Sequence, residues 1–434
     1  MGLPFLDQWL VRRMQWDRDL PPTSGQLREW QLARLREIVA HAQTNSPFYA
    51  RHLEGVDAFA IESFDDFSRL PTITPDHMRE TPEQLLCVSQ DAVARAVTLT
   101  SSGTTGPPKR IFHTEEDLEA TVDYFAWGMG NIAGKGRTVL VLMPGDRPGG
   151  VGRLLVDALT RAGGRAVTHG VMENVDVALD QCLEEAADCV VGSPAHVHML
   201  AHAWQRRGLP KGTIRSVLLC WDAIPEAVAA NVERLFGCRV FRHWGMIETG
   251  LGGAVECAPG SGMHLREADV FMEIVDPETG AGLPDGEFGE MVVTTPLKRG
   301  MPLIRYRTGD TGRILTGQCS CESPLRRLDP LIYRRLEGVA TGPETLTLRT
   351  LNEALYGVPG LADFAARFDG GRLRLTVCGG NGVSRDVRVA LQTVPAVERG
   401  RAFGCLEIDI DVKNDGTPAI AGLGKRCIHT DLEK

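Results

Sequence analysis

The chain has no excess of positive charge: 47 Lys and Arg residues stand against 56 Asp and Glu residues, a formal net charge of −9. This balance argues against a surface that binds nucleic acid or an anionic membrane. The opening residues, MGLPFLDQWLVRRM, contain no long apolar run and no small-residue cleavage site, and Leu6 stands where a myristoylation signal requires Ser or Thr. We therefore expect neither export nor attachment to a membrane.

The cysteines lack the pattern of a disulfide framework, because they number 11, which is odd, and most lie in apolar segments such as CVVG at 189–192. This usage is typical of a reducing compartment, so we expect a cytoplasmic protein. The sequence also has no internal repeat and no low-complexity tract. With 434 residues, 43% of them hydrophobic, it predicts a globular protein of two or three domains.

The stretch TSSGTTGPPK at 100–109 combines glycines with hydroxyl side chains directly after a strand-like segment. Backbone N–H groups and hydroxyls placed in this way can surround an anion, so the stretch predicts a phosphate-binding loop. It is not a Walker loop, because Gly103 and Gly106 are too close together and Lys109 lies three residues beyond them. The alternative is an ordinary flexible turn.

Apolar runs alternate with helical stretches from residue 138 to 221, and this alternation predicts βαβ units. Near-continuous apolar strands indicate a parallel sheet covered by helices on both faces. Upstream, residues 26–45 have the apolar spacing of a helix, and Thr74 and Pro75 offer the N-cap and the first residue of a short helix. The predicted fold class is therefore α/β.

The pattern changes after about residue 250 to short strands separated by turns. It predicts a β-rich subdomain at about 250–335 that completes a large domain of residues 1–335. Beyond it, a helix-like segment at 350–364 is followed by a strand, a helix and a strand. We expect residues 336–434 to form a small α+β domain.

Two further motifs place polar side chains on glycine-rich turns after strands. In HWGMIETG, Trp244 can stack on a flat base and Glu248 can hold a divalent cation near phosphate. In YRTGD, Asp310 can accept hydrogen bonds from both hydroxyls of a ribose, because a carboxylate has lone pairs for two donors. Each motif also has a plainer interpretation, a buried Trp at a strand end for the first and a common turn for the second.

Four metal-ligand residues form a separate constellation. Cys257 and His264 are followed some distance later by Cys319 and Cys321, in polar and turn-rich sequence. Three thiolates and one imidazole are a closed tetrahedral set suited to structural Zn²⁺. The alternative, a group of buried free thiols, fits poorly with polar segments such as GQCSCES.

The motifs TSSGTTGPPK, HWGMIETG and YRTGD, in this order, resemble those of the adenylate-forming (AMP-binding) superfamily of acyl-CoA synthetases and relatives. Four blocks further resemble the phenylacetate-CoA ligase branch, which includes coenzyme F390 synthetase-like proteins: NSPFYARHL, LPTITPDHMRE, GMHLREADVFMEIVDPETGAGLPDGEFGEMVVTTPLKRGMPLIRYRTGD and VPGLADF. The resemblance extends from about residue 26 to residue 430. It implies a large N-terminal adenylate-forming domain and a small, mobile C-terminal domain.

The resemblance also implies roles for individual residues. Glu248 would hold the Mg²⁺, Asp310 and Arg335 would contact the ribose of ATP, and Lys425 would be the catalytic lysine of adenylation. Some members of the branch carry a metal at the positions of the Cys and His cluster. The ATP phosphates would contact Ser101, Ser102, Gly103, Thr104, Thr105, Gly106 and Lys109.

The chain departs from the superfamily pattern at several of these positions. Trp244 replaces a tyrosine, Ile247 replaces a threonine that contacts phosphate, and residues 337–338 replace the paired aspartates of the hinge. Alignment on the C-terminal Gly-Lys pair selects Lys425, whereas alignment on the arginine after it puts Leu423 in the place of the lysine.

We expect an ATP-dependent acyl-CoA ligase that activates an aromatic or similar carboxylic acid through an acyl-adenylate and releases AMP and pyrophosphate. Its cofactors and partners would be ATP, Mg²⁺, coenzyme A, the acid and a structural Zn²⁺, with a homodimer as one option for its oligomeric state. One alternative is an adenylating enzyme with an acceptor other than coenzyme A, as in the F390 synthetase relatives. Another is a degenerate nucleotide-binding regulatory protein.

Overall fold

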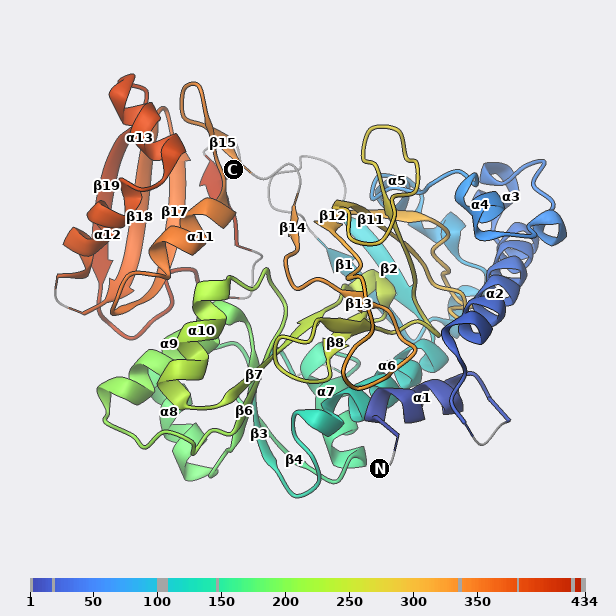
Figure 1. The fold of residues 1–434 in the computed structure, drawn as a ribbon, viewed down its shortest axis with the longest axis horizontal. Helices are drawn as coiled ribbons and strands as arrows, with labels where there is room; N and C mark the ends of the chain where they lie inside the picture. Colours follow the sequence, from blue (N-terminus) through green and yellow to red (C-terminus); the bar gives the residue numbers. More distant parts are fainter. Residues whose placement is uncertain are drawn as a thin grey trace. The chain divides into compact units, whose positions relative to one another are not determined.

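The computed structural model describes residues 3–17, 20–99, 108–145, 148–334, 338–380, 382–422 and 426–430. The chain divides into two compact units, each with its own hydrophobic core. Unit 1 consists of Met1–Asn131, Asp157–Ala162 and His243–Ile332, and unit 2 consists of Ile132–Val156, Gly163–Arg242 and Tyr333–Lys434. Figure 1 labels the helices and strands along the chain.

Unit 1 begins with short and long helices and continues into antiparallel strands. Helix α7 (Val151–Arg161) and strand β7 (Arg239–Trp244) run across the boundary between the units. The remaining elements of unit 1 are α1 (Phe5–Arg13), α2 (Ser24–Asn45), α3 (Pro47–His52), η1 (Ala58–Ala60), α4 (Phe64–Ser68), α5 (His77–Glu80), η2 (Pro82–Leu85), η3 (Gln90–Ala92), β1 (Arg95–Leu99), β2 (Lys109–His113), α6 (Glu115–Gly128), η4 (Met129–Asn131), η5 (Ile247–Thr249), β8 (Ala254–Glu256), β9 (Met263–Leu265), β10 (Phe271–Val275), β11 (Gly289–Thr294), β12 (Tyr306–Gly312) and β13 (Arg327–Leu328).

The sheets of unit 1 are antiparallel and position the motif residues. Strands β10, β11 and β12 are neighbours in one sheet, and β8 joins β9 and the last two residues of β7 in another. Helix α2 is amphipathic: Leu35, Ile38 and Val39 are buried in the core, and a capping box of Thr23 and Gln26 fixes its first turn. It ends at Asn45, because Ser46 starts the next helix as its N-cap.

Unit 2 contains the predicted βαβ alternation and a C-terminal α+β segment. Its elements besides α7 and β7 are β3 (Thr138–Leu142), β4 (Arg165–Thr168), α8 (Val175–Glu184), β5 (Cys189–Gly192), α9 (Pro194–Arg206), β6 (Ser216–Leu219), α10 (Glu226–Phe236), β14 (Tyr333–Arg334), β15 (Val339–Ala340), β16 (Thr345–Leu346), α11 (Leu348–Leu355), β17 (Leu361–Asp369), β18 (Arg372–Gly379), α12 (Val383–Leu391), α13 (Pro395–Ala402), β19 (Glu407–Lys413) and β20 (Ile428–Thr430).

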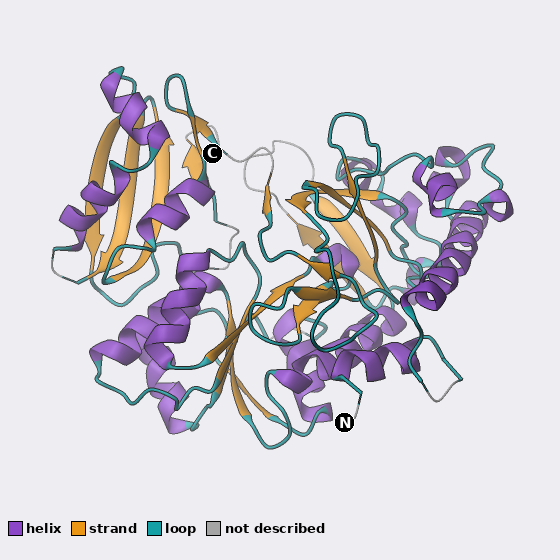
Figure 2. Cartoon of the chain, viewed as in Figure 1, coloured by secondary structure: helices purple, strands orange, loops and turns teal. Residues whose placement is uncertain are grey.

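The parallel sheet of unit 2 confirms the prediction from the apolar runs. The strands pair in the order β7-β6-β5-β3-β4, and every pairing between them is parallel. Strands β5 and β6 are buried along their whole length, as expected for strands covered on both faces. Figure 2 shows the helices α8, α9 and α10 beside these strands, and residues of all three helices belong to the same core.

The C-terminal segment forms a four-stranded sheet in the order β19-β18-β17-β20, with α12 packed on β18 and β19. This arrangement confirms the expected mixture of α and β structure. Residues 335–337 lie outside the described residues, so the domain boundary between 335 and 336 stays a prediction.

Two short helices differ from the prediction. Helix α5 begins at His77 and not at Pro75, because its first bonds run from the Arg79 and Glu80 N–H groups to the Asp76 carbonyl. The helix predicted over 350–364 ends at Leu355, and its last residues belong to strand β17. Pro359 has no N–H to continue a helix, and Gly360 takes a left-handed conformation with φ of 81°.

Among the helices in the described parts of the chain, none combines the length and the apolar character needed to span a membrane. All eleven cysteines are free thiols.

Candidate active site and metal cluster

The predicted phosphate loop connects the two strands of a hairpin. Strands β1 and β2 are antiparallel, and Leu99 is paired with Lys109, so the ladder holds the two ends of the loop together. Most of the loop falls outside the described residues, as do two of the predicted site residues in the C-terminal part. The predicted site residues not described are Ser101, Ser102, Gly103, Thr104, Thr105, Gly106, Arg335 and Lys425.

Three polar groups from three different motifs meet at the start of β2. The Lys109 ammonium forms an ion pair with Glu248 Oε1. The Tyr306 hydroxyl lies 3.2 Å from the Lys109 Nζ and 3.2 Å from the same Glu248 oxygen. The Glu248 and Tyr306 side chains are buried, and Lys109 is 14% exposed. The structure thus brings the phosphate-loop lysine, the predicted Mg²⁺ ligand and the first residue of YRTGD into one cluster.

A turn and a lysine also fix the backbone of Glu248. Glu248 lies in the short 3₁₀ turn η5, which ends at Gly250 in the left-handed conformation. The Lys298 Nζ donates to the Glu248 carbonyl at 3.4 Å. Burial lowers the pKa of Lys298, while the nearby Asp117 and Glu248 carboxylates act in the opposite direction. Lys298 therefore fixes the turn that carries the carboxylate.

Trp244 and Asp310 form a second contact. The Trp244 Nε1 donates to Asp310 Oδ2 at 3.4 Å, and both side chains are less than a tenth exposed. Gly253 lies against the indole, where a Cβ atom would come within 2.4 Å of the ring. Asp310 follows Gly309, which has a positive φ of 74°. A residue with a side chain would clash with the indole at position 253, and the positive φ at position 309 favours glycine.

The four predicted zinc ligands converge in unit 1. The ligand atoms of Cys257, His264, Cys319 and Cys321 all lie within 4.8 Å of one another. The Cys257 and Cys319 sulfurs are 3.6 Å apart, and Cys321 Sγ lies 3.4 Å from His264 Nε2. Four metal–ligand bonds of 2.0–2.3 Å in tetrahedral directions place ligand atoms at roughly such separations. The donor set and its geometry fit Zn²⁺.

The histidine of this cluster is oriented for metal binding. Its Nδ1 lies 3.2 Å from the Leu325 carbonyl, a contact in which the ring N–H donates and leaves Nε2 toward Cys321. Burial lowers the pKa of His264 to about 4, so the imidazole is neutral near pH 7. A neutral imidazole fixed by a backbone carbonyl is the usual state of a histidine that ligates a metal.

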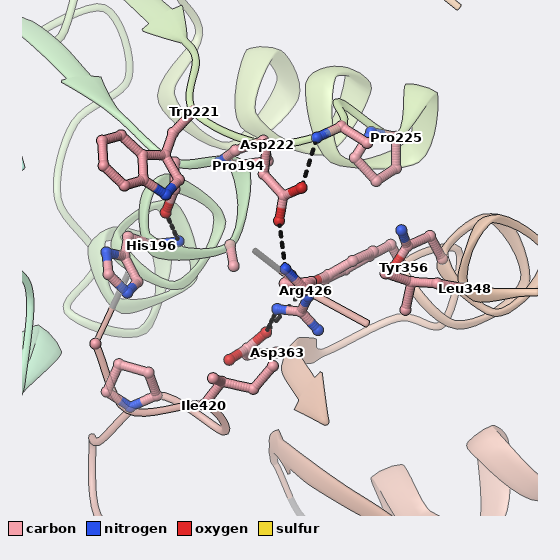
Figure 3. Close-up of a pocket in the computed structure, with 16 residues that line it drawn as sticks. Pro194, His196, Trp221, Asp222, Pro225, Leu348, Tyr356, Asp363, Ile420 and Arg426 are labelled. Atoms are coloured by element: carbon pink, nitrogen blue, oxygen red, sulfur yellow. Dashed lines mark hydrogen bonds and ion pairs between the residues drawn. The ribbon is translucent and has the colours of Figure 1, made fainter. Parts of the chain in front are cut away.

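A separate pocket lies in unit 2, and Figure 3 shows Arg426 between two carboxylates there. The Arg426 guanidinium pairs with Asp363 at 2.5 Å, and its backbone N–H donates to Asp222 at 3.1 Å. Burial raises the pKa of Asp363, but the charge and hydrogen bond of Arg426, together with the backbone N–H groups of Ala419 and Phe364, lower it by more. Trp221, which lines this pocket, has a positive φ of 81°, a rare backbone conformation for a non-glycine residue.

Sequence reasoning missed two residues that support Glu248. Tyr306 stands at the first position of a motif whose aspartate alone was given a role. Lys298 lies in the segment TTPLKRG, which belongs to a block that resembles the phenylacetate-CoA ligase branch but was given no role of its own. The signal for Tyr306 was present, since a hydroxyl inside a ligand-binding motif is itself a candidate, whereas nothing in the sequence pointed to Lys298.

The chain matches the family model for AMP-binding enzymes over residues 30–300. It is 30% identical over 330 residues to phenylacetate-coenzyme A ligase of Thermus thermophilus, covering 71% of this chain and 70% of that protein. It is 28% identical over 323 residues to the ligase of the same name from Pseudomonas putida, again covering 71% and 70%.

A solved structure of 2-hydroxyisobutyryl-CoA ligase, in the postadenylation state with 2-HIB-AMP, superposes with a TM-score of 0.75. The two sequences are 19% identical, and the match covers 93% of this chain and 89% of that one. The α/β fold, with its mixed sheets and C-terminal α+β segment, is thus that of an adenylate-forming protein. The chain belongs to the AMP-binding enzyme family.

Proposed function

We propose that this protein is an ATP-dependent acid–CoA ligase that activates an aromatic or similar carboxylic acid through an acyl-adenylate. The observation that carries the proposal is the 30% identity to a phenylacetate-coenzyme A ligase over 71% of the chain. The Lys109–Glu248–Tyr306 cluster and the Trp244–Asp310 contact support it, because they place the motif residues in two groups within one unit.

A carboxylate resists nucleophiles because its charge and resonance oppose attack at carbon. In the proposed first step, a carboxylate oxygen bonds to the α-phosphorus of ATP, the bond to the β-phosphate breaks, and pyrophosphate leaves. In the second step, a thiolate attacks the acyl carbon, the bond to the AMP oxygen breaks, and AMP leaves. Each step moves negative charge onto oxygens, so fixed cations and N–H donors would lower its barrier.

The residue roles follow the charges of the site. Lys109, with residues 101–106, would hold the β and γ phosphates, and Glu248 would hold the Mg²⁺ that supplies positive charge there. Asp310 and Arg335 would bind the ribose, with Trp244 beside the base.

Lys425, on the domain after residue 335, would contact the carboxylate oxygen of the acid and the α-phosphate of ATP. Lys425→Ala should therefore lower pyrophosphate release. We take the boundary between 335 and 336 as the hinge between a large and a small domain. The contrary result, wild-type pyrophosphate release in Lys425→Ala, would assign this lysine to the surface.

The cluster of Cys257, His264, Cys319 and Cys321 would hold a structural Zn²⁺. Such an ion would tie β9, which carries His264, to the segment between β12 and β13, which carries two of the cysteines. A closed set of four protein ligands leaves no position for substrate, so the ion would stabilise the fold without taking part in the reaction. We also propose a cytoplasmic location, in which these thiols stay reduced.

A panel of carboxylic acids, phenylacetate among them, tests the proposal. The purified chain is incubated with ATP and Mg²⁺, with and without coenzyme A, and pyrophosphate, AMP and thioester are measured. A ligase releases AMP and forms thioester only with the thiol present. Absence of pyrophosphate with every acid would instead favour a regulatory nucleotide-binding protein.

An acceptor other than coenzyme A is the second candidate. The chain is 25% identical to a D-alanine–D-alanyl carrier protein ligase of Bacillus velezensis, over 52% of this chain and 49% of that protein. Pyrophosphate release with no response of turnover to coenzyme A would favour this candidate. Size-exclusion chromatography with light scattering would decide whether a homodimer forms.

A further inference from the structure

Tyr306 occupies a fixed position between the two charges of the cluster. It is fully buried at the start of β12, where it is paired with Val293 of β11 and bridged to Ile73 on its other side. Two backbone bonds, from the Ile73 N–H to the Arg305 carbonyl and from the Arg307 N–H to the Ile73 carbonyl, hold this edge. The phenol oxygen therefore has little freedom to move away from its neighbours.

A phenol hydroxyl has one proton to donate and lone pairs to accept. Here it can donate its proton to the Glu248 carboxylate and accept an N–H from Lys109, since both atoms lie 3.2 Å away. The ammonium also lies 5.8 Å from the centroid of the Tyr306 ring, on a face that attracts cations. Both polar functions of the side chain thus act on the proposed cation site.

We propose that Tyr306 is a positioning residue for the divalent cation. Its hydroxyl would orient the Glu248 carboxylate, and it would hold the Lys109 ammonium when the cation replaces that ammonium on the carboxylate. The inference rests on the proposed role of Glu248. In this structure the Lys109 ammonium and the Tyr306 hydroxyl both contact Glu248 Oε1, so a cation bound to this oxygen would take the place of the ammonium there. The displaced ammonium is largely buried, and a buried charge needs a polar partner.

Lys298 does not serve the same purpose, because its ammonium donates to the Glu248 backbone carbonyl. Without the Tyr306 hydroxyl, Lys109 and Glu248 would lose a shared hydrogen-bonding group. A cation that binds Glu248 would then separate the buried Lys109–Glu248 ion pair with no neutral hydroxyl to accept a hydrogen bond from the lysine.

The test compares Tyr306→Phe with Tyr49→Phe, a matched control. Tyr49 is also fully buried and donates to the Pro302 carbonyl at 3.0 Å. Calorimetry measures ATP affinity with Mg²⁺ and with a chelator, and AMP affinity. Tyr306→Phe should reduce the gain in ATP affinity from Mg²⁺ by roughly tenfold, the effect of losing one hydrogen bond to a charged group. It should leave AMP affinity within about twofold, because AMP lacks the phosphates that share the cation.

Tyr49→Phe should keep the wild-type gain from Mg²⁺. Three results would overturn the inference. The gain in ATP affinity from Mg²⁺ could be unchanged in Tyr306→Phe, or the variant could lose ATP affinity equally with and without Mg²⁺. The third is a wild-type protein whose ATP affinity does not rise with Mg²⁺. The binding assay needs no acid substrate. If the wild type forms no acyl-adenylate yet the gain falls only in Tyr306→Phe, the proposed reaction fails and the role of Tyr306 stands.

Discussion

Replacing Asp363 with Asn should destabilise unit 2, because it removes the carboxylate that pairs with the Arg426 guanidinium. Asp363 is 1% exposed, and its carboxylate accepts hydrogen bonds from the Tyr356 hydroxyl, the Ala419 N–H and Arg426 Nη1. The guanidinium also donates to the Phe364 carbonyl. The substitution keeps the shape of the side chain and leaves a buried positive charge without its counterion.

The expected loss is about 3–5 kcal/mol of unfolding free energy, which is typical when one partner of a buried ion pair is removed. For a domain of 150–250 residues, each kcal/mol lowers Tm by about 2–4 °C, so the midpoint should fall by at least about 6 °C. The pKa of Asp363 is lowered from 3.8, so its contribution is present above that pH and is lost as the pH falls through the folded-state value.

Differential scanning calorimetry at pH 7 provides the measurement, and Glu344→Gln provides the control. Glu344 pairs with Arg399 at a more exposed position, with side chains 31% and 60% exposed, so its loss should cost about 1 kcal/mol or less. If Asp363→Asn and Glu344→Gln shifted the transition equally, the assignment of the Asp363–Arg426 pair as a stabilising contact would be wrong.

Three further predictions concern the nucleotide, the metal and pH. Asp310→Ala should weaken AMP binding by about tenfold, whereas Glu248→Gln should leave AMP binding unchanged and lower Mg²⁺-dependent turnover. Calorimetry measures AMP binding, and pyrophosphate release measures turnover. Equal effects of the two substitutions on AMP binding would refute the division of roles. Protein from zinc-supplemented cells should contain about one Zn²⁺ per chain, and Cys321→Ser should lose the ion and lower Tm; elemental analysis below about a tenth of an equivalent would exclude the site. Burial lowers the pKa of His196 and His198 to about 4 and that of His202 to about 3, so unfolding free energy should fall as the pH drops from 6.5 toward 4, by up to about 1.4 kcal/mol per pH unit for each. Urea titrations across that range check this, and a flat profile would contradict it.

The parallel sheet was predictable because buried strands such as β5 and β6 leave a signal that does not depend on distant contacts. The exact ends of α5 and α11 were not predictable in the same way. Pro75 is favourable at a helix start, yet the backbone bonds begin at the Asp76 carbonyl. Residues 361–364 contain apolar side chains compatible with either structure, and their pairing with β18 makes them a strand.

The site was predictable as a set of residues but not as a set of contacts. The order of the motifs indicated Glu248 and Asp310, and the spacing of the cysteines indicated the metal cluster. No sequence signal specified that Lys109 would pair with Glu248 or that Trp244 would donate to Asp310, since each pair is joined only by the folding of distant strands. Lys298 was missed for the same reason, because it supports Glu248 through a backbone carbonyl.

Transfer of an oxygen atom tests the central claim, that an acyl-adenylate forms on this chain. An acid that is active in the panel is labelled with ¹⁸O in its carboxylate and converted with ATP, Mg²⁺ and coenzyme A, and AMP is analysed by mass spectrometry. A carboxylate oxygen that attacks the α-phosphorus stays on AMP when the thiolate displaces it, so each AMP should carry one ¹⁸O. Unlabelled AMP, or label found in orthophosphate with ADP as the nucleotide product, would contradict the account.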